Sequence, residues 1–80
     1  MSSSLFIGTT SETVDVSSAD VIAEGQPWRS FIPDQSGQLF LWLSGDTAPL
    51  SLTVSSGAQY FMSVARFDTG GAVTTLAAIK

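Results

Sequence analysis

The chain has 80 residues and a formal net charge of −4, with three basic and seven acidic residues, no Cys and no His. This length allows one domain at most. The missing residue types exclude disulfides, thiol nucleophiles, Ser-His-Asp triads and the common zinc sites. The few basic residues exclude a nucleic-acid-binding patch.

The surface must be poor in charge. Charged residues make up 12% of the chain and apolar residues 44%, whereas an ordinary domain carries about 25% charged residues. A domain of this size has only a marginal core, and a soluble monomer normally carries more charge. We therefore expect the chain to function in an assembly.

The N-terminal segment lacks the basic region and apolar core of a signal peptide. No run of the sequence approaches the roughly 20 apolar residues of a membrane helix. We expect an unprocessed cytosolic product with no membrane partner. Leu5–Ile7 can form a short strand or a tail that adds to a neighbour's sheet. Residues 1–10 are accordingly expected to be a flexible or strand-exchanging segment, and residues 11–80 a single β-sandwich domain.

Alternation of apolar and polar residues predicts the first strands of this domain. Glu12–Val16 places its two valines on one face, as a half-buried strand does. Ala19–Glu24 fits one helical turn or a strand, and its β-branched residues favour the strand. Trp28–Ile32 follows a turn that contains Pro, and Pro33–Gly37 turns the chain again.

Gln38–Leu43 is the most hydrophobic stretch of the chain. Read as a strand, it places three leucines on one face and Phe40 and Trp42 on the other, because side chains alternate along a strand. Both faces are apolar. This strand is therefore expected either at the centre of a packed core or with one face against a partner.

The second half of the chain continues the strand pattern. Leu50–Val54 alternates cleanly, and Gln59–Phe67 is the longest run, with Tyr60, Met62, Val64 and Arg66 expected on one face and Phe61, Ser63, Ala65 and Phe67 on the other. Asp68–Gly71 carries a strong hairpin signal, and Ala72–Ile79 forms the last strand. We therefore predict an all-β fold, a small antiparallel β-sandwich or barrel of about seven to eight short strands. The expected core positions are Leu39, Leu41, Leu50, Leu52, Val54, Val64 and Val73.

The sequence offers no readable catalytic chemistry. The candidate carboxylates Asp34, Asp46 and Asp68 each lie in a Gly-containing turn, where Asp is favoured for its own backbone hydrogen bonds. Their surroundings do not match a calcium loop, and Gly70-Gly71 lacks the Lys and the following helix of a phosphate cradle. We therefore expect no enzyme activity, no cofactor and no metal.

The aromatic residues allow three interpretations. Trp28, Trp42 and Tyr60 can belong to the core, anchor a protein interface, or form a sugar-stacking platform, because each buries a large area. The surface residues we select as interface anchors are Leu5, Phe6, Trp28, Arg29, Phe40 and Trp42.

From Trp28 to Lys80 the layout resembles small structural proteins of tailed-phage virions. The shared features are the Arg-Ser-Phe-Ile strand in Trp28–Ile32, the apolar strand Leu39–Leu43, a Leu-x-Leu-x-Val strand and an aromatic strand within Leu50–Phe61, and a Gly-rich hairpin with a Val-x-x-Leu-Ala-Ala strand in Gly70–Ile79. Such proteins include capsid decoration or cement proteins and the β domains of head fibres.

The resemblance implies a non-enzymatic decoration or cement subunit on the capsid surface of a virion, made in the host cytoplasm. Its partner would be the major capsid protein or another virion protein, and many weak contacts would bridge neighbouring capsomers. We expect a homo-oligomer, with a trimer favoured. The alternative is a receptor- or carbohydrate-binding β-sandwich module of the tail-fibre or adhesin type. A small bacterial protein with the same sandwich also fits the pattern.

Overall fold

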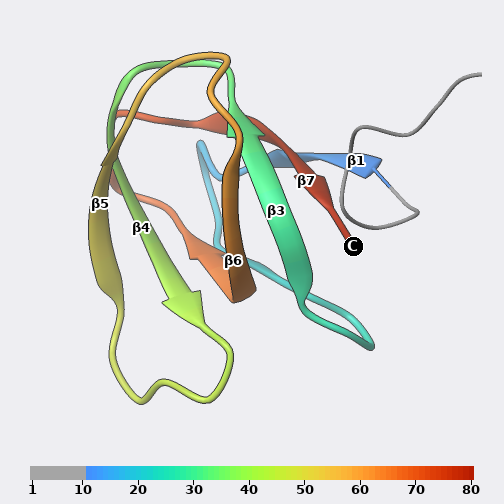
Figure 1. Cartoon of the computed structure of the whole chain (residues 1–80). Helices are drawn as coiled ribbons and strands as arrows, with labels where there is room; N and C mark the ends of the chain where they lie inside the picture. The colour runs from blue at the N-terminus through green and yellow to red at the C-terminus, as the bar shows by residue number, and fades with distance from the viewer. Residues whose placement is uncertain (1–10) are drawn as a thin grey trace, which may run out of the picture.

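The protein folds into seven β-strands and no helix in the computed structural model, which describes residues 11–80 (Figure 1). This confirms the expected all-β class. The predicted strand at Leu5–Ile7 lies outside the described residues. The strands are β1 (Ser11–Asp15), β2 (Val21–Ile22), β3 (Trp28–Pro33), β4 (Gly37–Leu43), β5 (Leu50–Val54), β6 (Tyr60–Asp68) and β7 (Thr75–Ile79).

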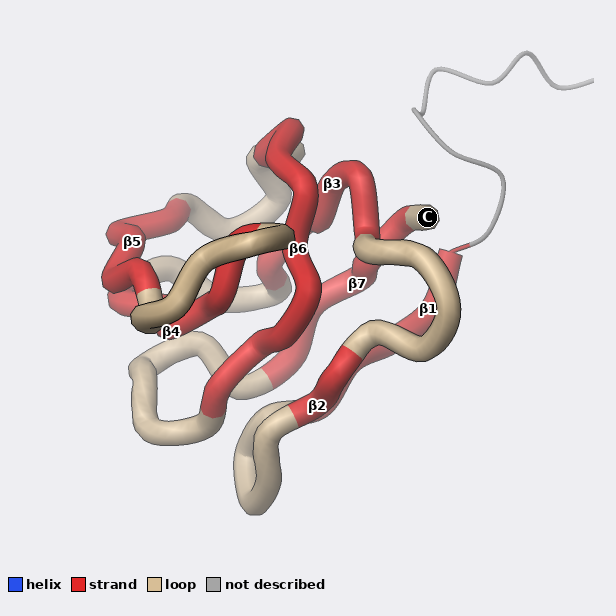
Figure 2. Tube along the Cα trace, turned by 90° about the horizontal axis from the view of Figure 1, so that it is seen from below, coloured by secondary structure: helices blue, strands red, loops and turns tan. Residues whose placement is uncertain are grey.

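The strands form one antiparallel sheet in the order β1-β7-β3-β6-β4-β5, and β2 pairs with the last part of β6. The sheet curls around one core, consistent with a small β-sandwich or barrel (Figures 1 and 2). One edge of β6 pairs with β3 and then β2, and its other edge pairs with β4. β6 therefore holds the two halves of the sheet together.

The predicted hairpin at Asp68–Gly71 is wrong, because β3 lies between β6 and β7 in the sheet. The connection instead passes the start of β4. Gly71 lies so close to this strand that an added Cβ would overlap the backbone oxygen of Gln38. Two residues later, the backbone N–H of Val73 donates to the same oxygen at 3.2 Å. Gly71 thus allows a close backbone crossing rather than a two-strand turn.

β4 has the two faces that its sequence predicts. Leu39 and Leu41 are fully buried in the core, whereas Phe40 and Trp42 are half-buried on the opposite face. β5 pairs with β4 in a regular register, but its burial differs from our expectation: Leu50 is 37% exposed and only Val54 is fully buried. The reason is that β5 is the last strand of the sheet, so no strand beyond it covers its leucines.

β6 changes face in its middle. Opposite β4, Trp42 pairs with Arg66 and Leu43 with Val64, so Ala65 has no partner and forms a β-bulge. Beyond this bulge the faces exchange: Phe67 is fully buried although regular alternation from Val64 would turn it outward. The predicted faces of Arg66 and Phe67 were therefore wrong, because a bulge shifts the period of two.

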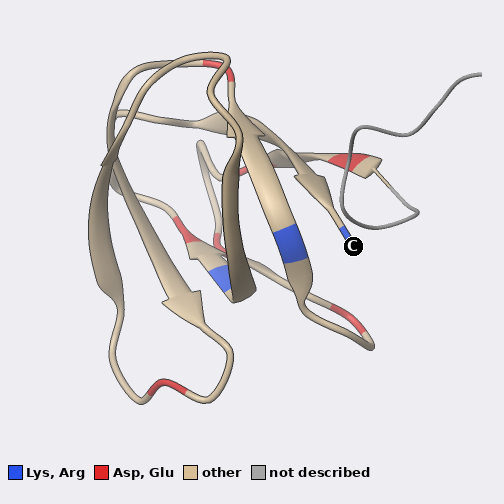
Figure 3. Cartoon of the chain, in the orientation of Figure 1, with Lys and Arg blue, Asp and Glu red and all other residues tan. Residues whose placement is uncertain are grey.

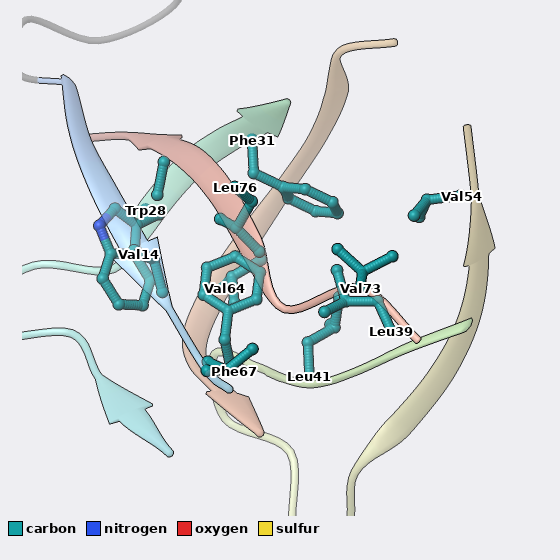
Figure 4. Packing of buried hydrophobic residues seen from close by; sticks show 12 residues of the cluster. Val14, Trp28, Phe31, Leu39, Leu41, Val54, Val64, Phe67, Val73 and Leu76 are labelled. Carbon is teal, nitrogen blue, oxygen red and sulfur yellow. The ribbon is translucent and has the colours of Figure 1, made fainter. Parts of the chain in front are cut away.

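The core extends from β1 to β5 across the inside of the sheet (Figure 4). Its centre is aromatic. The ring centroid of Phe67 lies 5.0 Å from that of Trp28 and 5.3 Å from that of Phe31. Trp28 is only 1% exposed. We expected Trp28 as an interface anchor, but the structure places it in the core, where it leaves no surface for a partner.

Two strands are shorter than their patterns predicted. β2 covers only two residues of the Ala19–Glu24 pattern, and one further backbone bond joins Ala23 N to Ala65 O at 2.8 Å. β7 begins at Thr75 rather than Ala72. The residues before Thr75 are bonded elsewhere: Val73 bonds to β4, and Thr74 O accepts from the N–H of Val16, which directly follows β1, at 2.8 Å.

Candidate interaction surface

Two of the predicted interface residues lie together on the outer face of the sheet. Phe40 and Trp42 project from the side of β4 that faces away from the core. The sheet register places Asp68 opposite Phe40 and Arg66 opposite Trp42. We call these four residues the β4–β6 outer surface.

Hydrogen bonds fix the Trp42 side chain in this surface. Its indole Nε1 donates to Asp68 Oδ2 at 2.8 Å, and Arg66 Nε donates to the other oxygen of the same carboxylate at 2.6 Å. The guanidinium carbon of Arg66 lies 5.3 Å from the centre of the Trp42 ring, a cation–π distance. The polar edge of the indole is thus satisfied within the chain, and what remains for a partner is its apolar body.

A third carboxylate joins the network from the loop before β2. Asp20 Oδ2 accepts from Arg66 Nη2 at 2.8 Å, and its other oxygen accepts from the backbone N–H of Thr69 at 2.8 Å. The hydrogen bond to Asp68 is the largest of the effects that raise the pKa of Arg66 above its ordinary value, although desolvation opposes it. Arg66 therefore stays charged and, through its bond to Asp20, holds the loop before β2 against the outer surface.

The other predicted interface residues do not join this surface. Arg29 is exposed on β3, which β6 separates from β4. Trp28 lies in the core, as described above. Leu5 and Phe6 lie outside the described residues.

Sequence reasoning missed the contribution of Arg66, Asp68 and Asp20. Asp20 and Arg66 are 46 positions apart, so no local pattern joins them. One signal was present: strict alternation put Arg66 on the same face as Val64, where an arginine would be buried without a partner. That conflict indicates a change of face between these residues.

A pocket of about 260 Å³ lies away from this surface, between β1, β2 and the C-terminal residue. Its polar groups contact one another. The indole Nε1 of Trp28 donates to Glu12 Oε2 at 2.7 Å, and Lys80 Nζ donates to the backbone oxygen of Glu24 at 2.8 Å. Lys80 Nζ also lies 3.9 Å from Glu12 Oε2 and 5.7 Å from the Trp28 ring centre. These contacts fix the open end of the core.

Charged residues are few along the described chain (Figure 3), and Arg66 forms ion pairs with Asp20 and Asp68. Within residues 11–80, no three Asp, Glu, His or Cys side chains gather as they would around a metal ion. Asp34 and Asp46 are exposed in loops, and Asp68 is engaged by Trp42 and Arg66. The same part of the chain has no helix long and apolar enough to cross a membrane.

Comparisons with protein-family models, with curated proteins and with solved structures give no match for this chain.

Proposed function

We propose that the chain is a non-enzymatic structural subunit of a virion, a capsid decoration or cement protein that binds the major capsid protein and bridges neighbouring capsomers. The observation that carries this proposal is the β4–β6 outer surface. Phe40 and Trp42 are large and partly exposed, and the hydrogen bond to Asp68 holds Trp42 in place. Rigid aromatic anchors of this kind contribute much of the binding free energy in protein interfaces.

The charge of the chain supports the same role. The chain carries few charges, and the two in the β4–β6 outer surface, Arg66 and Asp68, pair with each other, so binding a shell there would desolvate an ion pair rather than isolated ions. If many copies bind one shell together, their weak individual contacts combine into a high overall affinity. The sequence resemblance to tailed-phage virion proteins supplies the identity of the shell in this proposal.

The test is co-sedimentation of the full chain with purified capsids from the candidate phage that lack the decoration. We expect the wild-type chain to pellet with the shells, and Phe40→Ser and Trp42→Ser to weaken binding by about tenfold or more. Phe61→Ser is the matched control: Phe61 is 59% exposed and lies on β6 opposite β3. Circular dichroism checks that each variant remains folded.

A wild-type chain that does not pellet with the shells contradicts the proposed role. Equal losses for Trp42→Ser and Phe61→Ser would leave the role in place but reject the β4–β6 outer surface as the contact. Mass spectrometry of purified particles gives an independent readout, in which the chain is expected in the head fraction.

The second candidate is a carbohydrate- or receptor-binding module. One observation favours it: Arg66 and Asp68 flank the Trp42 ring, and sites for small ligands combine an aromatic wall with a few polar groups. Titration with oligosaccharides, monitored by tryptophan emission, distinguishes this candidate. A saturable change that is lost in Trp42→Ser would favour the binding module over the capsid subunit.

A further inference from the structure

The two outermost strands of the sheet differ in how their free edges are protected. β1 and β5 stand at opposite ends of the strand order, and both views place them on opposite sides of the molecule (Figures 1 and 2). Within residues 11–80, each pairs with a neighbour on one side only. A free edge exposes unpaired backbone N–H and C=O groups, and proteins normally guard such edges with charge, proline or a bulge.

β1 carries such a guard. Glu12 and Asp15 lie within its five residues. Glu12 points to the same side as Val14 and bonds to Trp28, so a strand added beside β1 would meet an inward-facing carboxylate. Asp15 adds a second negative charge at the end of this edge.

β5 has none of these devices. Its sequence, Leu50-Ser-Leu-Thr-Val54, carries no charge and no proline. It pairs with β4 at five successive positions without a register shift, so no bulge turns this edge away. It is a short but regular edge, open to another strand.

The core is also incomplete at β5. The inward residues of β4 are fully buried, but Leu50, opposite Leu41, is 37% exposed, and Leu52 is half-buried. Both leucines face the core side of the sheet and lack a strand beyond them. A further strand at this edge would cover them and would pair the free backbone groups.

We propose that β5 pairs with β5 of a second copy of this chain, antiparallel about a two-fold axis at Leu52. This register sets Leu50 opposite the partner's Val54 and Ser51 opposite the partner's Thr53, so apolar residues meet on the core side and hydroxyls on the outer side. Pairing β5 with the partner's β1 would instead bring Glu12 and Asp15 to the interface. The proposal gives a dimer rather than the trimer expected from the sequence, and it holds whether or not the chain binds a shell.

The register can be tested with charges on the outer side of β5. Ser51 and Thr53 are both exposed and point away from the core. The double substitution Ser51→Lys with Thr53→Lys places like charges opposite each other across the proposed axis. Ser51→Lys with Thr53→Asp places opposite charges there. Both variants carry Ser51→Lys and lose the same hydrogen bond from Gln38 to Ser51, so this loss cancels in the comparison.

Sedimentation velocity of the full chain at micromolar concentrations gives the readout. We expect the wild type to sediment as twice its 8.4 kDa mass. The two-lysine variant should dissociate with an affinity weakened by about tenfold or more, and the Lys/Asp variant should associate as the wild type does. Ser11→Lys with Thr13→Lys on β1 is the matched control and should leave the dimer unchanged.

A monomeric wild type overturns the proposal, and so does dissociation by the β1 control. Equal behaviour of the two β5 variants also overturns it, because another strand, such as the N-terminal run of a neighbour, would then occupy the edge. Shell binding is measured separately. A monomer that pellets with capsids would contradict the β5 pairing but agree with the proposed function. A dimer that does not pellet with capsids would agree with the β5 pairing but contradict the proposed function.

Discussion

Val64 and Phe67 both point into the core, although they are three positions apart on one strand. The bulge at Ala65 makes this possible. Two steps along β6, from Val64 to Arg66, lie opposite one step along β4, so the side chains that follow the bulge change face. The same bulge turns Arg66 outward beside Trp42. One extra residue thus completes the aromatic core and also builds the β4–β6 outer surface.

The bulge can be tested with two phenylalanines of β6. Strict alternation would place Phe61 and Phe67 on the same face, but Phe61 is 59% exposed and Phe67 is fully buried. Phe67→Ala should therefore lower the free energy of unfolding by about 3–5 kcal/mol, because it opens a cavity between Trp28 and Phe31. Phe61→Ala should change it by only about 0.5 kcal/mol. Urea unfolding measures both values, and similar losses would contradict the bulge.

A second comparison tests the edge position of β5. Leu41 and Leu50 lie directly opposite each other, but Leu41 is 0% exposed and Leu50 is 37% exposed. Leu41→Ala should cost about 2–5 kcal/mol of unfolding free energy, as full truncation in a packed core does. Leu50→Ala should cost clearly less at protein concentrations where the chain is monomeric. Equal costs would mean that β5 is covered in the isolated chain.

The strands could be predicted from the sequence because alternation is a local property. Leu39 and Leu41 in the core, with Phe40 and Trp42 opposite, follow from the period of two in β4. The order of the strands could not be predicted. The Asp68–Gly71 segment has hairpin composition, but it crosses β4, and only the non-local contact with the Gln38 backbone explains Gly71.

The candidate surface could be predicted only in part. Phe40 and Trp42 were identified because they occupy the second apolar face of a single strand. Their polar neighbours come from β6 and from the loop before β2, and the pairing across the sheet depends on a bulge. The position of Trp28 could not be predicted. An aromatic residue at the start of a strand fits a core or an interface equally well, and only the folded chain distinguishes the two.

The fold should be independent of metal ions. The described residues contain no group of three potential ligands, and Asp68 already accepts bonds from Trp42 and Arg66. Thermal melts with and without excess EDTA are therefore expected to coincide. A large drop in melting temperature after chelation would show that an ion stabilises the folded state.

The last prediction concerns the buried indole of Trp28. Its Nε1–H donates to Glu12 Oε2 at 2.7 Å, at the point where the core opens toward the pocket beside Lys80. Glu12→Ala would leave this donor without its partner inside a residue that is 1% exposed. A buried donor without an acceptor costs about 1–3 kcal/mol, so the variant should be destabilised by that amount.

Glu12→Gln is the control, because the amide oxygen can still accept the indole hydrogen while the negative charge is removed. It should retain most of the stability of the wild type. The chain has two tryptophans, so two indole N–H signals are expected in an ¹⁵N NMR spectrum, and only that of Trp28 should move strongly and lose protection from hydrogen exchange in Glu12→Ala. If Glu12→Gln were as destabilising as Glu12→Ala, the charge of Glu12 beside Lys80, rather than its bond to Trp28, would hold this end of the core together.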